Sequence, residues 1–201
     1  MSEMLRRALA AALCLVVLST TTSFASTTSV DVVNYAYQPA KPKIALSNGI
    51  LWHNTSDTSH TVTFNVPAVA PGSVGSLSPG KSASLTFFHG GAYAYHCIFH
   101  SQQVGTIKVK PSISPTSGTT STNFTLRVAT QNAASGFVQD VQRRKGSGSW
   151  LLWQSVTTQL VVFNPAPSEN GTWHFRTRYR KTSTNEETGW SPELTVVVSQ
   201  P

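Results

Sequence analysis

Charged residues are scarce in this sequence. Lys, Arg, Asp and Glu make up 11% of the 201 residues, and the formal net charge is +7. No run of five or six like charges occurs, so we expect no nucleic-acid partner. Low charge, with Ser, Thr, Gly and Pro between short apolar runs, is typical of short buried strands rather than surface helices. The sequence therefore predicts an all-β protein.

Long apolar runs are also missing, and the one near the start is short. It covers residues 8–18, follows two arginines and precedes the small residues Ser23 and Ala25. Such a run is too short for a membrane-spanning helix, and its flanks are those of a secretory signal peptide. We expect residues 1–25 to be removed as a signal peptide. The remaining chain would be exported, to the periplasm or the extracellular space, without a membrane span.

Cysteine is nearly absent. There are two, and Cys14 falls within residues 1–25, which leaves Cys97 as the single thiol of the exported chain. Cys97 then has no partner for an internal disulfide. A leftover thiol in an exported protein is reactive, paired with another molecule, or protected by a metal.

Common catalytic patterns are missing too. No two histidines are separated by one residue, as copper oxidases require, and no Gly-x-Ser-x-Gly turn occurs. Residues 26–110 contain only two carboxylates, Asp31 and Asp57. We therefore expect no enzymatic activity and no catalytic residues.

What the chain does contain is short alternating apolar runs. In the first half they cover residues 30–37, 50–54, 60–64, 82–88, 92–96 and 105–110. In the second half they cover residues 123–130, 137–145, 150–154, 158–163, 171–181 and 193–199. Residues 111–122 are rich in Ser, Thr, Pro and Gly and predict a linker between domains 26–110 and 123–201. Regularly spaced strands make the second domain a β-sandwich.

The residues around Cys97 are those of a metal site. His100 lies three positions after the thiol and Gln103 three positions further on, so a strand end and one loop carry three donors. One thiolate, two imidazoles and a weak axial donor are the ligand set of blue-copper sites. The second imidazole must come from another strand, and His60, which begins an alternating run, is the best placed.

Residues 28–110 resemble a small cupredoxin of the plastocyanin, pseudoazurin and amicyanin group. The matching pieces are Tyr37-Gln38-Pro39, Trp52-His53-Asn54, His60-Thr61-Val62, Tyr93-Ala94-Tyr95-His96-Cys97-x-x-His100 and Val104-Gly105-Thr106-Ile107-Lys108-Val109. The resemblance implies a Greek-key sandwich that carries electrons through one type 1 copper bound by His60, Cys97, His100 and Gln103. It also implies a redox partner protein and an electron exit at the His100 edge, ringed by Ile98, Phe99 and Pro67.

Two positions depart from that family. Gln103 stands where the family usually has Met. Gln is an axial ligand in the stellacyanin-like plant proteins, where this harder donor implies a lower reduction potential. The alternatives are a surface glutamine beside an empty axial position, or Gln102 in its place. Thr61 stands where Asn often braces the Cys loop, so that brace is weakened or replaced. We expect His96, next to Cys97, to be structural.

Residues 112–199 resemble a fibronectin type III domain, an immunoglobulin-like sandwich. The pieces are Val141-Gln142-Arg143-Arg144, Gly171-Thr172-Trp173-His174-Phe175-Arg176 and Gly189-Trp190-Ser191-Pro192. Trp173 stands where the family often has a corner Tyr. Arg176, Arg178 and Arg180 share one face with Trp190 within reach, which predicts a structural ladder. A surface for an acidic protein or polymer is the alternative.

Two functions remain open from the sequence. The first is an exported blue-copper electron carrier with an appended sandwich. The alternative is a secreted binding or adhesion protein whose cupredoxin half holds copper for structure or storage, or not at all.

Overall fold

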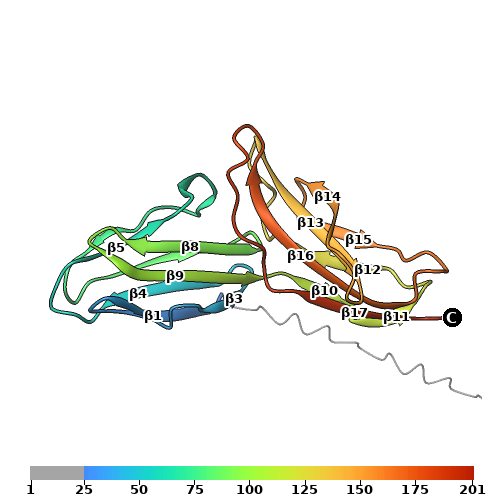
Figure 1. Ribbon diagram of the computed structural model, residues 1–201, viewed down its shortest axis with the longest axis horizontal. Helices are drawn as coiled ribbons and strands as arrows, with labels where there is room; N and C mark the ends of the chain where they lie inside the picture. The colour runs from blue at the N-terminus through green and yellow to red at the C-terminus, as the bar shows by residue number, and fades with distance from the viewer. Residues whose placement is uncertain (1–24) are drawn as a thin grey trace, which may run out of the picture.

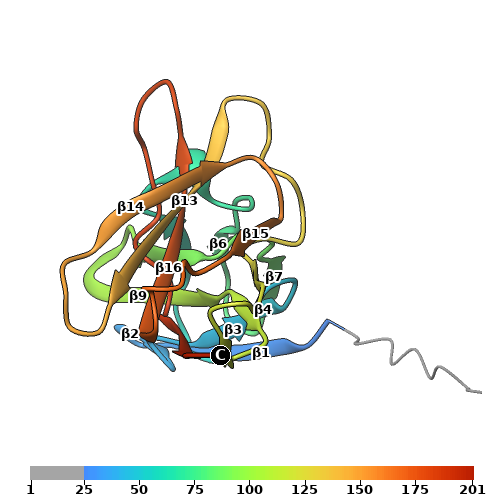
Figure 2. The ribbon, with the colours of Figure 1, turned by 90° about the vertical axis from the view of Figure 1, so that its right-hand side faces the viewer.

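The computed structural model describes residues 25–201 and is all-β, as predicted. Its strands form two successive sandwiches along the long axis of the molecule (Figure 1). Figure 2 looks from the second sandwich and shows the first one behind it. The predicted signal peptide lies outside the described residues, apart from its last position. Within residues 25–201, no helix is long and apolar enough to cross a membrane.

Two sheets form the first sandwich. One has the order β2-β1-β4-β7 and the other β3-β9-β8-β5-β6. The strands of the first sheet are β1 (Thr27–Val33), β2 (Ala36–Gln38), β4 (Gly49–Asn54) and β7 (Ser82–Thr86). Those of the second are β3 (Lys43–Ala45), β5 (His60–Phe64), β6 (Gly75–Leu77), β8 (Gly91–Cys97) and β9 (His100–Lys110). A short 3-10 helix, η1 (Pro67–Val69), follows β5.

Alternating burial along the central strands builds the first core. On β8 the inward positions are Gly91, Tyr93, Tyr95 and Cys97, so the thiol is the last inward side chain of that strand. Trp52 and Tyr95 are almost fully buried in the same core, and each contributes several kcal/mol through apolar burial, about 25 cal/mol per Å². The core therefore ends at Cys97.

The second sandwich also has two sheets, with the orders β10-β12-β15 and β11-β17-β16-β13-β14. The smaller sheet has β10 (Ser112–Ser114), β12 (Phe124–Arg127) and β15 (Leu160–Phe163). The larger has β11 (Ser117–Thr119), β13 (Phe137–Lys145), β14 (Leu151–Val156), β16 (Gly171–Lys181) and β17 (Leu194–Ser199). Its core is separate and contains Phe124, Phe163 and Phe175.

The segment 111–122, which the sequence predicts to be a linker, carries two strands. β10 pairs with β12, and β11 pairs with β17, so both strands belong to the second sandwich. Only Pro111 separates β9 from β10. Short edge strands need few apolar residues, because one side faces solvent, which explains why the composition resembles that of a linker.

Backbone hydrogen bonds join the two sandwiches directly. Ala92 on β8 and Gly189 exchange two N–H···O bonds, each 2.8 Å long. Gly90 N–H donates to the Val128 carbonyl at 2.9 Å, in the same region. These bonds continue strand pairing from one sandwich to the other, so the junction has a fixed geometry.

Small residues allow this close approach. A Cβ atom on Gly91 would lie 2.4 Å from Thr188 Oγ1, and one on Gly90 would lie 2.7 Å from Thr177 Cγ2. Next to them the His89 ring stacks on Tyr179, with 4.0 Å between ring centroids. Burial lowers the pKa of His89 to about 4, so this ring is neutral at pH 7.

Candidate metal centre

The four predicted donors come together at the end of the first sandwich. His60 is the first residue of β5, Cys97 the last of β8 and His100 the first of β9, with Gln103 further along β9. Cys97 and His100 are paired across the two-residue turn between β8 and β9. β8 begins at the junction and runs about 20 Å to Cys97, at ~3.3 Å per residue, so the donors lie at the end remote from the second sandwich.

The imidazole and thiol donors are spaced as ligands of a single small ion. Cys97 Sγ lies 3.6 Å from His100 Nδ1 and 3.9 Å from His60 Nδ1, and the three donors all fall within 4.8 Å of one another. Sulfur and nitrogen ligands at about 2.3 and 2.0 Å from one ion are ~3.5–3.8 Å apart at tetrahedral to trigonal angles. His60, Cys97 and His100 therefore fit a trigonal site.

Gln103 is buried against these donors. Its side chain is 0% exposed, and its Oε1 lies 2.8 Å from His60 Nδ1. Its Nε2 donates to the carbonyl oxygens of Ala36 at 2.9 Å and Val33 at 3.2 Å. Because the amide nitrogen is held by these two carbonyls, the oxygen faces His60 and accepts a hydrogen bond from its Nδ1. The surface alternative for Gln103 is wrong, and Gln102 is exposed.

The neighbouring residues of β5 hold the two buried donors. Thr58 Oγ1 lies 3.2 Å from His60 Nε2, which leaves Nδ1 for the site. Thr61 N–H donates to Cys97 Sγ at 3.3 Å, and Thr61 Oγ1 accepts a 2.9 Å bond from Ile98 N–H. Thr61 thus replaces the asparagine brace on the Cys loop.

Asn54 is a site residue that the sequence analysis missed. It is 0% exposed, and its Nδ2 donates to the carbonyls of Thr58 and Leu77, each at 2.8 Å. Its Oδ1 accepts bonds from the backbone and hydroxyl of Ser56, so it shapes the loop that leads into His60. The available signal was its inward position on an alternating strand after Trp52.

Exposed apolar side chains occur next to His100, in the turn between β8 and β9 and at Tyr35. Ile98 is 61% exposed, Phe99 56% and Tyr35 57%, and the Tyr35 ring meets the His100 ring edge-on at 4.9 Å. Tyr35 was not expected here. Pro67 was expected at this edge, and that expectation is wrong, because η1 follows the other end of β5 and packs toward β16 of the second sandwich.

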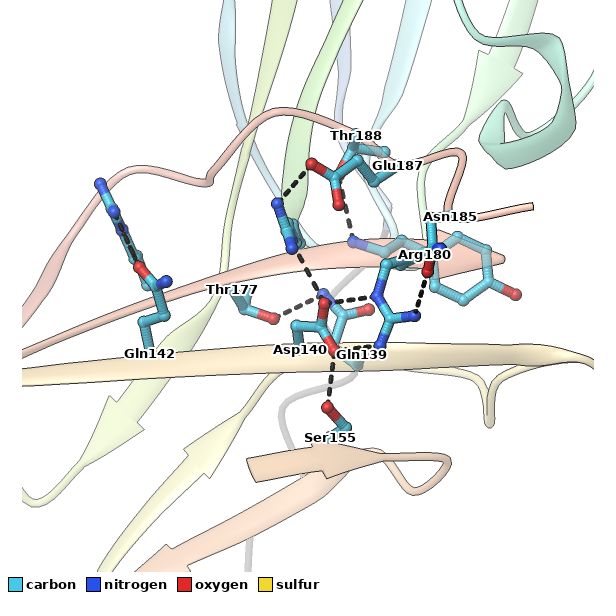
Figure 3. Close-up of polar contacts among 12 residues, drawn as sticks. Gln139, Asp140, Gln142, Ser155, Thr177, Arg180, Asn185, Glu187 and Thr188 are labelled. Atoms are coloured by element: carbon cyan, nitrogen blue, oxygen red, sulfur yellow. Dashed lines mark hydrogen bonds and ion pairs between the residues drawn. The ribbon is translucent and has the colours of Figure 1, made fainter. Parts of the chain in front are cut away.

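Acidic side chains and an aromatic ring contact the arginines on the basic face of the second sandwich. Arg176 and Arg178 lie 4.8 and 4.4 Å from the Trp190 ring centre, which confirms the predicted contact of Trp190 with these arginines. Arg178 pairs with Asp140 at 3.2 Å. Arg180 pairs with the same carboxylate at 2.7 Å (Figure 3). Burial alone would raise the pKa of Asp140, but hydrogen bonds from Arg180 and Ser155 outweigh it and lower that pKa.

Trp173 forms the bond expected of a corner residue. Its Nε1 donates to the Glu169 carbonyl, four residues upstream, at 2.8 Å. A corner Tyr in such sandwiches bonds its hydroxyl back to the upstream backbone in the same way. The Trp173 indole N–H makes a side-chain-to-backbone bond of the same kind.

Comparisons with known proteins give only structural likenesses. No protein-family model matches the chain, and no curated protein matches it. Among solved structures, a reduced amicyanin variant is 25% identical, with a TM-score of 0.38, over 43% of this chain and 82% of that one. A purple cupredoxin from Nitrosopumilus maritimus is 22% identical, with a TM-score of 0.38, over 41% of this chain and 98% of that one. The structural neighbours of this chain are thus cupredoxins, matched over less than half of its length.

Proposed function

We propose that the protein binds one copper ion through His60, Cys97, His100 and Gln103 and carries single electrons. The observation that carries this proposal is the donor set itself: two Nδ1 atoms and a thiol in a trigonal arrangement, with an amide oxygen facing them. That combination of soft thiolate, imidazoles and a weak oxygen donor selects copper among the first-row metals.

The protein's part is to hold the donors before the metal arrives. Bound copper supplies one-electron oxidation and reduction at this site. Thr58, Thr61 and Asn54 fix the positions of His60 and Cys97 through hydrogen bonds that do not depend on a metal. A ligand set that is already fixed moves little between oxidation states, which lowers the reorganisation cost of electron transfer.

The apolar rim of His100 is the proposed contact for a redox partner protein. The exposed side chains of Ile98, Phe99 and Tyr35 can be buried in an interface with a partner protein. The His100 imidazole beside Tyr35 then provides the path for the electron to the buried donors. The protein has no catalytic role in this proposal. The signal-peptide pattern of residues 1–25 supports a location in the periplasm or outside the cell.

The second sandwich is proposed to be a fibronectin type III-like spacer. Its support is the strand order, the bond from Trp173 to Glu169 and the compensated arginine face. A partner among acidic proteins or polymers is the less favoured role, because Asp140 and Glu187 already pair with the arginines.

A redox titration of the copper-loaded full-length chain tests electron transfer. We expect the Cu(II) colour to disappear on reduction and to return fully on reoxidation over several cycles, with one electron per chain. Copper that binds but cannot be cycled, or that leaves the protein on reduction, would favour the storage or structural alternative.

A further inference from the structure

A second candidate site lies where the two sandwiches meet. A cavity of about 710 Å³ opens between the β3 and β9 ends of the first sandwich and β10, β12 and β17 of the second. Its apolar lining comes from both sides: Ile44 and Leu46, then Pro111, Ile113 and Leu194. This volume is within the range of small-molecule sites, which commonly form between domains.

The walls of this cleft are held in place. Besides the backbone bonds at Ala92 and Gly90, Thr130 N–H donates to the Phe88 carbonyl at 2.9 Å. The Ser47 and Thr130 hydroxyls meet at 2.6 Å, and Thr130 itself lines the cleft. A cleft with fixed walls requires little ordering when a ligand enters.

Most of the charged side chains that line the cleft are cationic. Lys43, Lys110 and Arg127 line it, and none of the three forms an ion pair among residues 25–201. The single acid in the lining, Glu193, is already occupied, because Arg144 lies 3.1 Å and His174 Nδ1 3.6 Å from its carboxylate. Three cations around an apolar floor complement an anion with an apolar body.

We propose that the interdomain cleft binds a small amphiphilic anion, a carboxylate or sulfonate carried on a hydrocarbon or aromatic body. The anionic group contacts Lys43, Lys110 and Arg127, and the apolar body lies against the half-buried side chains of Leu46 and Ile113. Since both sandwiches supply walls, the bound anion also stabilises their relative arrangement.

Fluorescence titration of the full-length chain with 8-anilinonaphthalene-1-sulfonate tests this site. We expect saturable binding of one dye per chain and displacement by octanoate. Acetate, which lacks the apolar body, and octanol, which lacks the charge, should each compete at least about tenfold more weakly. Lys110→Glu with Arg127→Glu should weaken dye binding about tenfold at low salt, whereas Lys81→Glu, remote from the cleft, should not.

Ser112→Trp provides a test independent of charge, because a bulky side chain at this exposed strand position would fill the cleft. It should abolish dye binding and leave the thermal unfolding curve and the copper spectrum unchanged. The proposal is overturned if the dye fails to saturate at one per chain, if Lys81→Glu weakens it as much as the cleft variants, or if Ser112→Trp binds it normally. A dye-dependent change of oligomeric state, with the site formed by two copies, would also overturn it.

Discussion

In the first sandwich, the buried polar side chains gather at one end of the core, whereas in the second they form a network beside the junction. Asn54, His60, Thr61 and Gln103 belong to the first group, and none of them carries a fixed charge. The second group centres on Asp140, which is paired with two arginines. In the first arrangement, His60 Nδ1 lies beside Gln103 Oε1 and Cys97 Sγ with no paired charge. In the second, the carboxylate of Asp140 is paired with two arginines. Among residues 25–201, only the first arrangement groups three His or Cys donor atoms within 4.8 Å of one another.

The largest effect on folding is expected from removing the carboxylate of Asp140, which pairs with two arginines. Asp140→Ala would leave Arg178 and Arg180 without their shared carboxylate, which should lower the free energy of unfolding of the second sandwich by about 3 kcal/mol. Chemical denaturation, followed by Trp fluorescence, measures this. The copper spectrum should not change. If Asp140→Ala lost the copper spectrum while its first sandwich stayed folded, the metal centre would depend on the second sandwich, and the two regions would not be separate.

The junction should be sensitive to a single methyl group. Gly91→Ala places a Cβ atom against Thr188 and should cost about 1–3 kcal/mol or shift the sandwiches apart. Small-angle scattering and thermal unfolding report the two outcomes. Gly49→Ala is the matched control, since its Cβ atom would meet neighbours only at ordinary contact distances of 3.4 Å or more. Equal behaviour of the two variants would contradict the close junction.

His89 should make the junction pH-dependent. Its pKa is about 4 in the folded state and about 6.5 in an unfolded chain. The unfolded state therefore binds the proton first, so stability is fully present above pH ~6.5 and declines as the pH falls toward 4, by at most about 3 kcal/mol. Thermal unfolding of the wild type and His89→Phe across this range measures it. If the stability of His89→Phe fell with pH as much as that of the wild type, another group would be responsible for the effect.

The smallest structural change concerns Gln103, the proposed axial donor. Gln103→Met should raise the reduction potential, because the softer thioether favours Cu(I). It also removes the bonds to Val33 and Ala36, so Gln103→Glu is a useful second variant that keeps an oxygen donor. Voltammetry gives both potentials. If neither substitution shifted the potential or the spectrum, Gln103 would not be a ligand.

The sequence was most informative where spacing and geometry coincide. Cys97 and His100 flank one tight turn, so their positions alone bring the two donors together. His60 and Gln103 followed from strand alternation and from family resemblance. The orientation of Gln103 could not be predicted, because it depends on two carbonyls of a distant turn between β1 and β2.

The junction was the least predictable feature. It consists of backbone bonds, two glycines and threonine contacts, for which no residue pattern exists. Strands β10 and β11 were missed for a related reason, since edge strands without apolar alternation read as loops. The arginine face and the inward face of β16 were predicted correctly, because an eleven-residue alternation fixes both faces.

Titration of the purified chain with Cu(II), followed by visible absorption, tests the metal centre most directly. Thiolate-to-copper charge transfer should give intense colour that saturates at one ion per chain and is lost in Cys97→Ser. His53→Ala, at a histidine outside the site, should keep it. A protein that stays colourless, or a colour that survives in Cys97→Ser, would contradict a copper centre at this end of the first sandwich.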